Sequence, residues 1–188
     1  MSDTEPCGNW WERTAEMPYP GLHQGTASTC VFAAVGGAVN HLLGEQAWTI
    51  DSLVQAHPVR HVALLAVAET AIAPFIDRLE AFEHKDSRQS NPLSPAIRSW
   101  ISEGGIVILS LVCRETGSEY PEEWHMFTLV ACTDTSFQVW DSNGDSGSFN
   151  DHDIKTGIHV RGGRFYHAHP EQHLVVIRKR CSIFPQSP

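Results

Sequence analysis

Apolar residues in the first half of the chain follow the periodicity of α-helices. Residues 30–43 are apolar on nearly every side, which is typical of a buried central helix. Gly44 follows directly and is a suitable helix terminator. Three further helices are predicted from capping residues and apolar spacing: one after Thr49, one over residues 62–83 with a break at Pro74, and one from Ser94 to Gly104.

The periodicity changes after the glycine pair at 104–105, where short apolar runs predict β-strands. Residues 106–112, 127–132, 136–140 and 173–177 have this character, and the second and third are joined by a short turn. Because helices come first and strands later, the order predicts an α+β fold. We expect residues 1–188 to form one domain, with residues 1–20 as an irregular N-terminal arm.

The composition narrows the range of partners. The chain has 188 residues, of which 41% are hydrophobic, and 13 Lys and Arg against 22 Asp and Glu give a formal charge of −9. This charge disfavours nucleic acid and anionic membrane surfaces as partners. The polar, acidic N-terminus does not resemble a secretory signal peptide, so we expect a cytoplasmic protein or one exported without a Sec signal.

Five cysteines without a CxxC pair indicate a reducing compartment rather than a disulfide framework. Cys113 and Cys132 fall in predicted strands, which favours a place in the core. Cys7 and Cys181 lie near the two ends of the sequence and are expected to be free thiols, with a disulfide between them as the alternative. Cys30 differs from these four because it begins the predicted central helix, where unsatisfied N–H groups and the positive end of the helix dipole favour a thiolate.

Three other residues have positions that suit nucleophilic catalysis by Cys30. His125 begins one predicted strand and Asp141 ends the next, so antiparallel pairing would place them side by side as a base and its orienting partner. Asn143 is the alternative to Asp141 as the residue that orients His125. Gln24 lies six residues before Cys30, where its amide and the backbone N–H of Cys30 could both point at an oxyanion.

These residues carry a resemblance to a known family. The segment from Gln24 to Ala34, which contains Cys30, resembles the nucleophile segment of papain-like cysteine peptidases, in which a glutamine precedes the cysteine by the same interval. The interval of 16 residues from His125 to Asp141 is similar to their spacing from His to Asn or Asp. The use of Asp and the small size are closest to the bacterial branch that includes double-glycine leader peptidases.

The resemblance covers roughly residues 21–145 and implies a papain-like fold, with the nucleophile helix packed on a C-terminal antiparallel sheet. It departs from the family at Thr29 and Val31, which flank the cysteine where a glycine is common, and residues 146–170 have no counterpart. It implies Cys30 as nucleophile, His125 as general base and acid, Asp141 as orienting residue and Gln24 as oxyanion donor.

The implied activity is hydrolysis of a peptide or amide bond in a peptide or protein substrate through a thioester. The same chemistry would serve a deamidase, a transamidase or an acyltransferase or cyclase, and a catalytically silent binding module is a further alternative. No cofactor is expected. No metal is expected either. His167, His169 and His173 are close in sequence, but no acidic or cysteine residue accompanies them at the spacing of a metal site.

Overall fold

A computed structural model describes residues 21–22, 29–57, 63–85, 93–115, 123–142, 146–156, 158–160, 164–167 and 173–180. Its helices are α2 (Cys30–Leu43), α3 (Ile50–Ala56), α4 (Leu64–Ile72), the 3-10 turn η2 (Ala73–Phe75), α5 (Leu93–Ser102) and α6 (Asp151–Thr156). Its strands are β1 (Leu79–Lys85), β2 (Ile106–Glu115), β3 (Glu123–Cys132), β4 (Ser136–Asp141), β5 (Ser146–Asn150), β6 (Ile158–Val160), β7 (Arg164–His167) and β8 (His173–Lys179).

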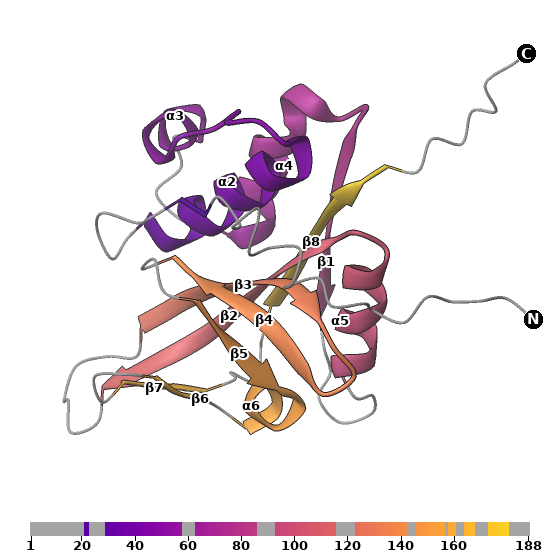
Figure 1. The fold of residues 1–188 in the computed structure, drawn as a ribbon. Helices are drawn as coiled ribbons and strands as arrows, with labels where there is room; N and C mark the ends of the chain where they lie inside the picture. Colours follow the sequence, from indigo (N-terminus) through magenta and orange to yellow (C-terminus); the bar gives the residue numbers. More distant parts are fainter. Residues whose placement is uncertain are drawn as a thin grey trace, which may run out of the picture.

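The strands form one antiparallel sheet in the order β1-β8-β2-β3-β4-β5. The β6–β7 hairpin extends this sheet by pairing with the later part of β2, beyond the part that pairs with β8. Helices α2, α3 and α4 lie together on one side of the sheet, and α5 lies on the other (Figure 1). Within the described residues, no helix is long and apolar enough to cross a membrane.

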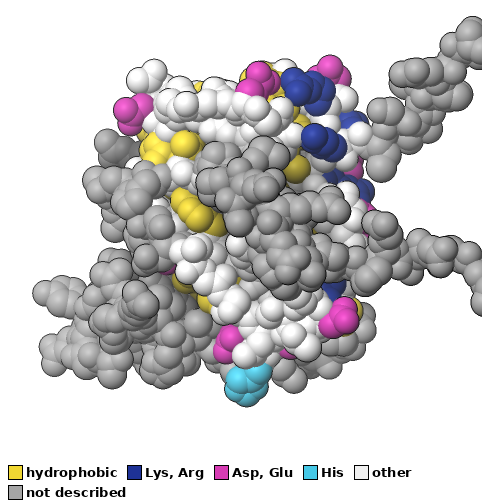
Figure 2. Space-filling model, in the orientation of Figure 1, with side chains coloured by type: hydrophobic (Ala, Val, Ile, Leu, Met, Phe, Trp, Pro, Cys, Tyr) yellow, Lys and Arg dark blue, Asp and Glu magenta, His cyan; other side chains and the backbone are white. Residues whose placement is uncertain are grey.

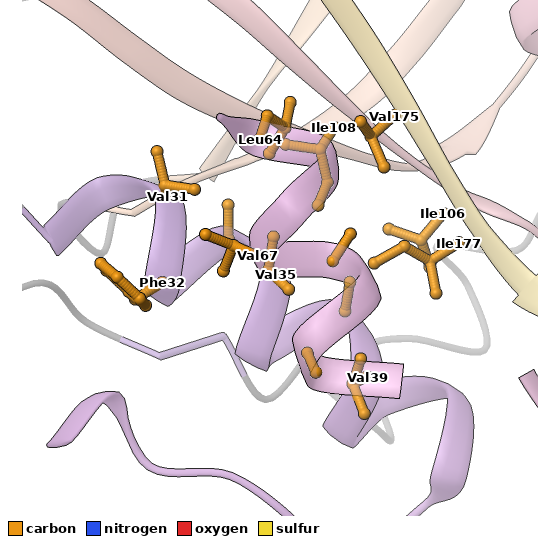
Figure 3. Close-up of a cluster of buried hydrophobic side chains, with 14 of the residues drawn as sticks. Val31, Phe32, Val35, Val39, Leu64, Val67, Ile106, Ile108, Val175 and Ile177 are labelled. Atoms are coloured by element: carbon orange, nitrogen blue, oxygen red, sulfur yellow. The ribbon is translucent and has the colours of Figure 1, made fainter. Parts of the chain in front are cut away.

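Alternation along the strands divides the buried side chains between two cores. Ile106 and Ile108 of β2 belong to the core against α2 and α4, whereas Val107 and Leu109 belong to the core against α5. Figure 3 shows the first core, in which side chains from α2 and α4 meet those of β2 and β8. The nucleophile helix predicted from the sequence is therefore buried between a helix and the sheet.

One predicted helix is wrong in its second half. The helix expected over residues 62–83 ends at Ile72, passes through the turn around Pro74, and gives way to β1, which pairs with β8 from Leu79 opposite Lys179 onward. Leu79 faces the first core and Phe82 packs against the second, which is the period of two that a strand requires. The structure also contains β5, β6, β7 and α6, which the sequence pattern did not predict.

Charged side chains on the surface are paired across elements. Arg98 of α5 bonds Asp151 of α6 at 2.7 Å, and Arg178 of β8 bonds Glu80 of β1 at 2.7 Å. On the face drawn in Figure 2, the described basic side chains lie beside acidic ones rather than apart from them. Such exposed pairs contribute little stability individually.

Residues 21–22 lie between the central helix and the sheet. A Cβ on Gly21 would come within 1.9 Å of Cε2 of Trp140 on β4, so the backbone there lies directly on the indole ring. Leu22 packs on α2, since its Cδ1 is 2.8 Å from the position of a Cβ on Gly36. The chain thus contacts both halves of the fold a few residues before Cys30.

We predict that Gly21→Ala destabilises the protein by about 1–3 kcal/mol, because the added methyl group overlaps the Trp140 ring. Urea denaturation of the two proteins measures the difference. Gly147→Ala is the matched control, since a Cβ there meets no atom within 4 Å. Equal stabilities for Gly21→Ala and Gly147→Ala would contradict the packing described.

Candidate active site

Cys30 is the first residue of α2 and lies at the end of the helix where backbone N–H groups have no partner within the helix. Thr29 occupies the N-cap position, but its side chain makes no capping hydrogen bond. At the other end the helix stops at Gly44, whose φ of 72° is left-handed, as the sequence predicted. The Cys30 side chain is buried, with 5% of the residue exposed.

The β3–β4 hairpin places His125 beside Asp141. Phe127 pairs with Asp141 at the end of β4, and His125 lies two residues earlier on β3. The Nε2 of His125 is 2.7 Å from Oδ1 of Asp141, and both residues are buried. This is the contact expected from the spacing. A carboxylate accepts hydrogen bonds, so Nε2 of His125 is the nitrogen that donates to it in this contact, which leaves Nδ1 as the second ring nitrogen.

The Cys30 sulfur lies against the same part of β3. Its Sγ is 3.9 Å from the carbonyl oxygen of Trp124, a weak S–H···O contact, and the backbone amide of Met126 also hydrogen-bonds the sulfur. These two backbone groups flank His125 in sequence. The structure therefore brings the first turn of α2 to the strand segment that carries the histidine.

The electrostatics of Cys30 differ from the sequence expectation. Burial raises the pKa of the Cys30 thiol above its ordinary value of 9.0, and the negative charge of Asp141 raises it further. Hydrogen bonds from the backbone amides of Val31, Met126 and Cys30 lower it, as expected at a helix start, but they do not offset desolvation. Burial therefore opposes the thiolate that the helix start alone favours.

This raised pKa predicts the pH dependence of alkylation. Because only the thiolate reacts, modification of Cys30 by iodoacetamide should accelerate up to pH values above 9.0 and show no plateau near neutral pH. Intact-mass measurements with peptide mapping follow the rate at Cys30 alone. A rate that is already maximal at pH 7 would show that the thiolate is stable in the resting protein and would contradict this electrostatic account.

Two phenylalanines support the imidazole ring. The ring of His125 meets Phe127 in an edge-to-face arrangement with centroids 5.0 Å apart, and Phe127 meets Phe149 of β5 at 5.2 Å. Aromatic pairs of this geometry favour one relative orientation. The sequence did not indicate Phe149 as a supporting residue, because the run Ser-Gly-Ser-Phe-Asn contains a single apolar residue and does not predict a strand.

Several other residues were singled out from the sequence, and the structure describes only some of them. Gln24, the predicted oxyanion donor, lies outside the described residues, as do Asn143, Cys7, Cys181 and His169. Cys132 is buried in the core against α5, as predicted. Trp124 has 43% of its surface exposed beside the candidate site.

The fold is similar to that of a solved peptidase domain. The peptidase domain of Streptococcus ComA, a bi-functional ABC transporter involved in a quorum-sensing pathway, matches with a TM-score of 0.54 and 11% identity, over 86% of this chain and 99% of that one. A Bacillus anthracis protein described as a C39-like peptidase matches with a TM-score of 0.48 and 10% identity, over 87% and 96% of the two chains. No family model and no curated protein sequence matches. The likeness to the ComA domain confirms the predicted α+β, papain-like fold.

Proposed function

We propose that this protein is a papain-like thiol hydrolase that cleaves a peptide or amide bond, with Cys30 as the nucleophile. His125 would act as general base and then general acid, Asp141 would orient and stabilise its imidazolium, and Gln24 would contribute to an oxyanion hole. The observation that carries this proposal is the buried His125–Asp141 pair at 2.7 Å, in which His125 belongs to the segment of β3 whose backbone contacts the Cys30 sulfur. The shared fold with a peptidase domain supports it.

The raised pKa of the Cys30 thiol favours a first step in which the proton leaves the sulfur during the attack. Nδ1 of His125 accepts the thiol proton as the sulfur attacks the substrate carbonyl carbon, and Asp141 stabilises the positive charge that forms on the ring. The carbonyl oxygen then carries the negative charge, which the backbone N–H of Cys30 and the Gln24 amide would stabilise. The imidazolium donates its proton to the departing amine, leaving a thioester on Cys30.

A water molecule completes hydrolysis. His125 removes a proton from the water, whose oxygen attacks the thioester carbonyl, and the thiol regains a proton as it departs. If an amine takes the place of water, the same thioester gives transamidation or cyclisation. If the attacked amide belongs to an Asn or Gln side chain, the reaction is deamidation. The products of these reactions differ in mass.

The proposal is tested by incubating the purified protein with a complex peptide mixture and analysing it by mass spectrometry. We expect new peptide termini, and we expect them to disappear when the protein is first alkylated with iodoacetamide at high pH. Conversion of side-chain amides to acids without new termini would identify a deamidase, and amine adducts would identify an acyltransferase. A mixture that remains unchanged would support the catalytically silent alternative.

A further inference from the structure

Trp124 is an exposed aromatic residue next to the candidate catalytic histidine. With 43% of its surface accessible, it is one of three large hydrophobic residues exposed within the described part of the chain. The other two, Val54 on α3 and Ile76 after η2, belong to elements that the candidate site does not use. Exposed tryptophans are frequent where proteins bind ligands, because the indole buries a large apolar area with little loss of conformational freedom.

The position of Trp124 follows from the alternation along β3. Trp124 and Met126 lie on one face of the sheet and His125 and Phe127 on the other. Met126 belongs to the core that contains α2, so the Trp124 side chain lies on the face that α2 covers. The carbonyl oxygen of Trp124 is 3.9 Å from the Cys30 sulfur, so the backbone that carries the indole lies next to the first residue of that helix.

Two buried apolar side chains adjoin Trp124 on this face of the sheet. Its register partner on β2 is Val112, which is buried, and its neighbour on the same face, Met126, is buried as well. A ligand group that covers the indole could therefore extend the apolar surface that Val112 and Met126 form. This favours an apolar group over a basic one, although the face of an indole can attract either.

We propose that Trp124 is a substrate-binding residue that packs against an apolar, preferably aromatic, side chain adjacent to the bond that Cys30 attacks. This inference rests on the proposed function and adds a substrate class to it. The Trp124 carbonyl oxygen is 3.9 Å from the sulfur, so a substrate side chain next to the attacked carbonyl would come close to the residue that carries the indole. An apolar contact of this kind changes specificity about 10- to 100-fold.

The test uses epoxysuccinyl peptides, which alkylate thiols and can carry an amino acid on either side of the reacting carbon. Two series place Phe, Ala, Arg or Glu on one side or the other, and iodoacetamide serves as an electrophile without a side chain. The rate at Cys30 is followed by intact mass and peptide mapping and is divided by the iodoacetamide rate of the same variant. The proteins are wild type, Trp124→Ala, Trp124→Phe and, as a control at an exposed apolar residue outside the site, Ile76→Ala.

We expect wild type and Ile76→Ala to prefer Phe over Ala about 10- to 100-fold in one of the two series. Trp124→Ala should lose most of this preference and Trp124→Phe should keep most of it. A Phe preference that survives in Trp124→Ala, no preference in either series, or a preference for Arg would overturn this inference and leave the proposed function standing. If neither reagent modifies Cys30, the proposed function fails and this inference fails with it.

Discussion

Replacing Cys30 with alanine should lower the turnover of a peptide substrate by at least about 1,000-fold, because no other group can form the thioester. The fold should be retained, since the substitution removes one buried sulfur atom and its weak contact with the Trp124 carbonyl. We expect a cost in unfolding free energy on the order of 1 kcal/mol. Turnover is measured by mass spectrometry of the products and stability by urea denaturation.

Cys132 provides the matched control for Cys30. Both are buried cysteines outside any disulfide, but Cys132 lies at the end of β3 in the core against α5. Cys132→Ala should therefore reduce stability by a similar amount and leave turnover nearly unchanged. Equal losses of turnover in the two variants would show that the effect of Cys30→Ala arises from packing, and full turnover in Cys30→Ala would exclude Cys30 as the nucleophile.

Replacing Asp141 should have two opposite effects: it removes the group that orients the His125 imidazole, and it removes a negative charge near the Cys30 thiol. Asp141→Ala removes the hydrogen-bond acceptor of His125 Nε2 and should lower kcat about 100- to 10,000-fold, because the ring loses its fixed orientation and its charge stabilisation. Asp141→Asn keeps an acceptor oxygen without the charge, so its loss should be smaller. The ratio of the two kcat values reports the contribution of orientation.

The same variants should make the Cys30 thiol more acidic. The negative charge of Asp141 raises the pKa of Cys30, so its removal lowers that pKa, and the pH profile of iodoacetamide modification should shift to lower pH in both variants. Faster alkylation combined with slower turnover is the expected pattern. A shift to higher pH, or an unchanged kcat in Asp141→Ala, would contradict the role proposed for this carboxylate.

The His125–Asp141 contact could be predicted from the sequence because it depends on local structure. The two residues lie in consecutive strands joined by a short turn, and this turn limits the register of the pair. A histidine at the start of the first strand and an aspartate at the end of the second then meet without reference to the rest of the fold. The ends of α2 were predictable for a similar reason, since Gly44 adopts the left-handed conformation that stops the helix.

The features that sequence reasoning missed depend on contacts between distant segments. Residues 79–83 have enough apolar side chains for either a helix or a strand, and only pairing with β8, about a hundred residues later, selects the strand. The pKa of Cys30 is a second case. The helix start favours a thiolate, but the desolvation that opposes it comes from packing against β3, which the pattern of residues 29–43 does not contain.

The central claim is that Cys30 forms a thioester with help from His125, and acid-quenched mass spectrometry tests it most directly. Wild-type protein and His125→Ala are mixed with a cleaved peptide, quenched within one turnover and digested to locate the acyl group. We predict an acyl adduct on Cys30 in the wild type, release of that adduct by hydroxylamine, and a much slower appearance in His125→Ala. Cleavage that proceeds with no adduct on Cys30, or with the adduct on another residue, would contradict the claim.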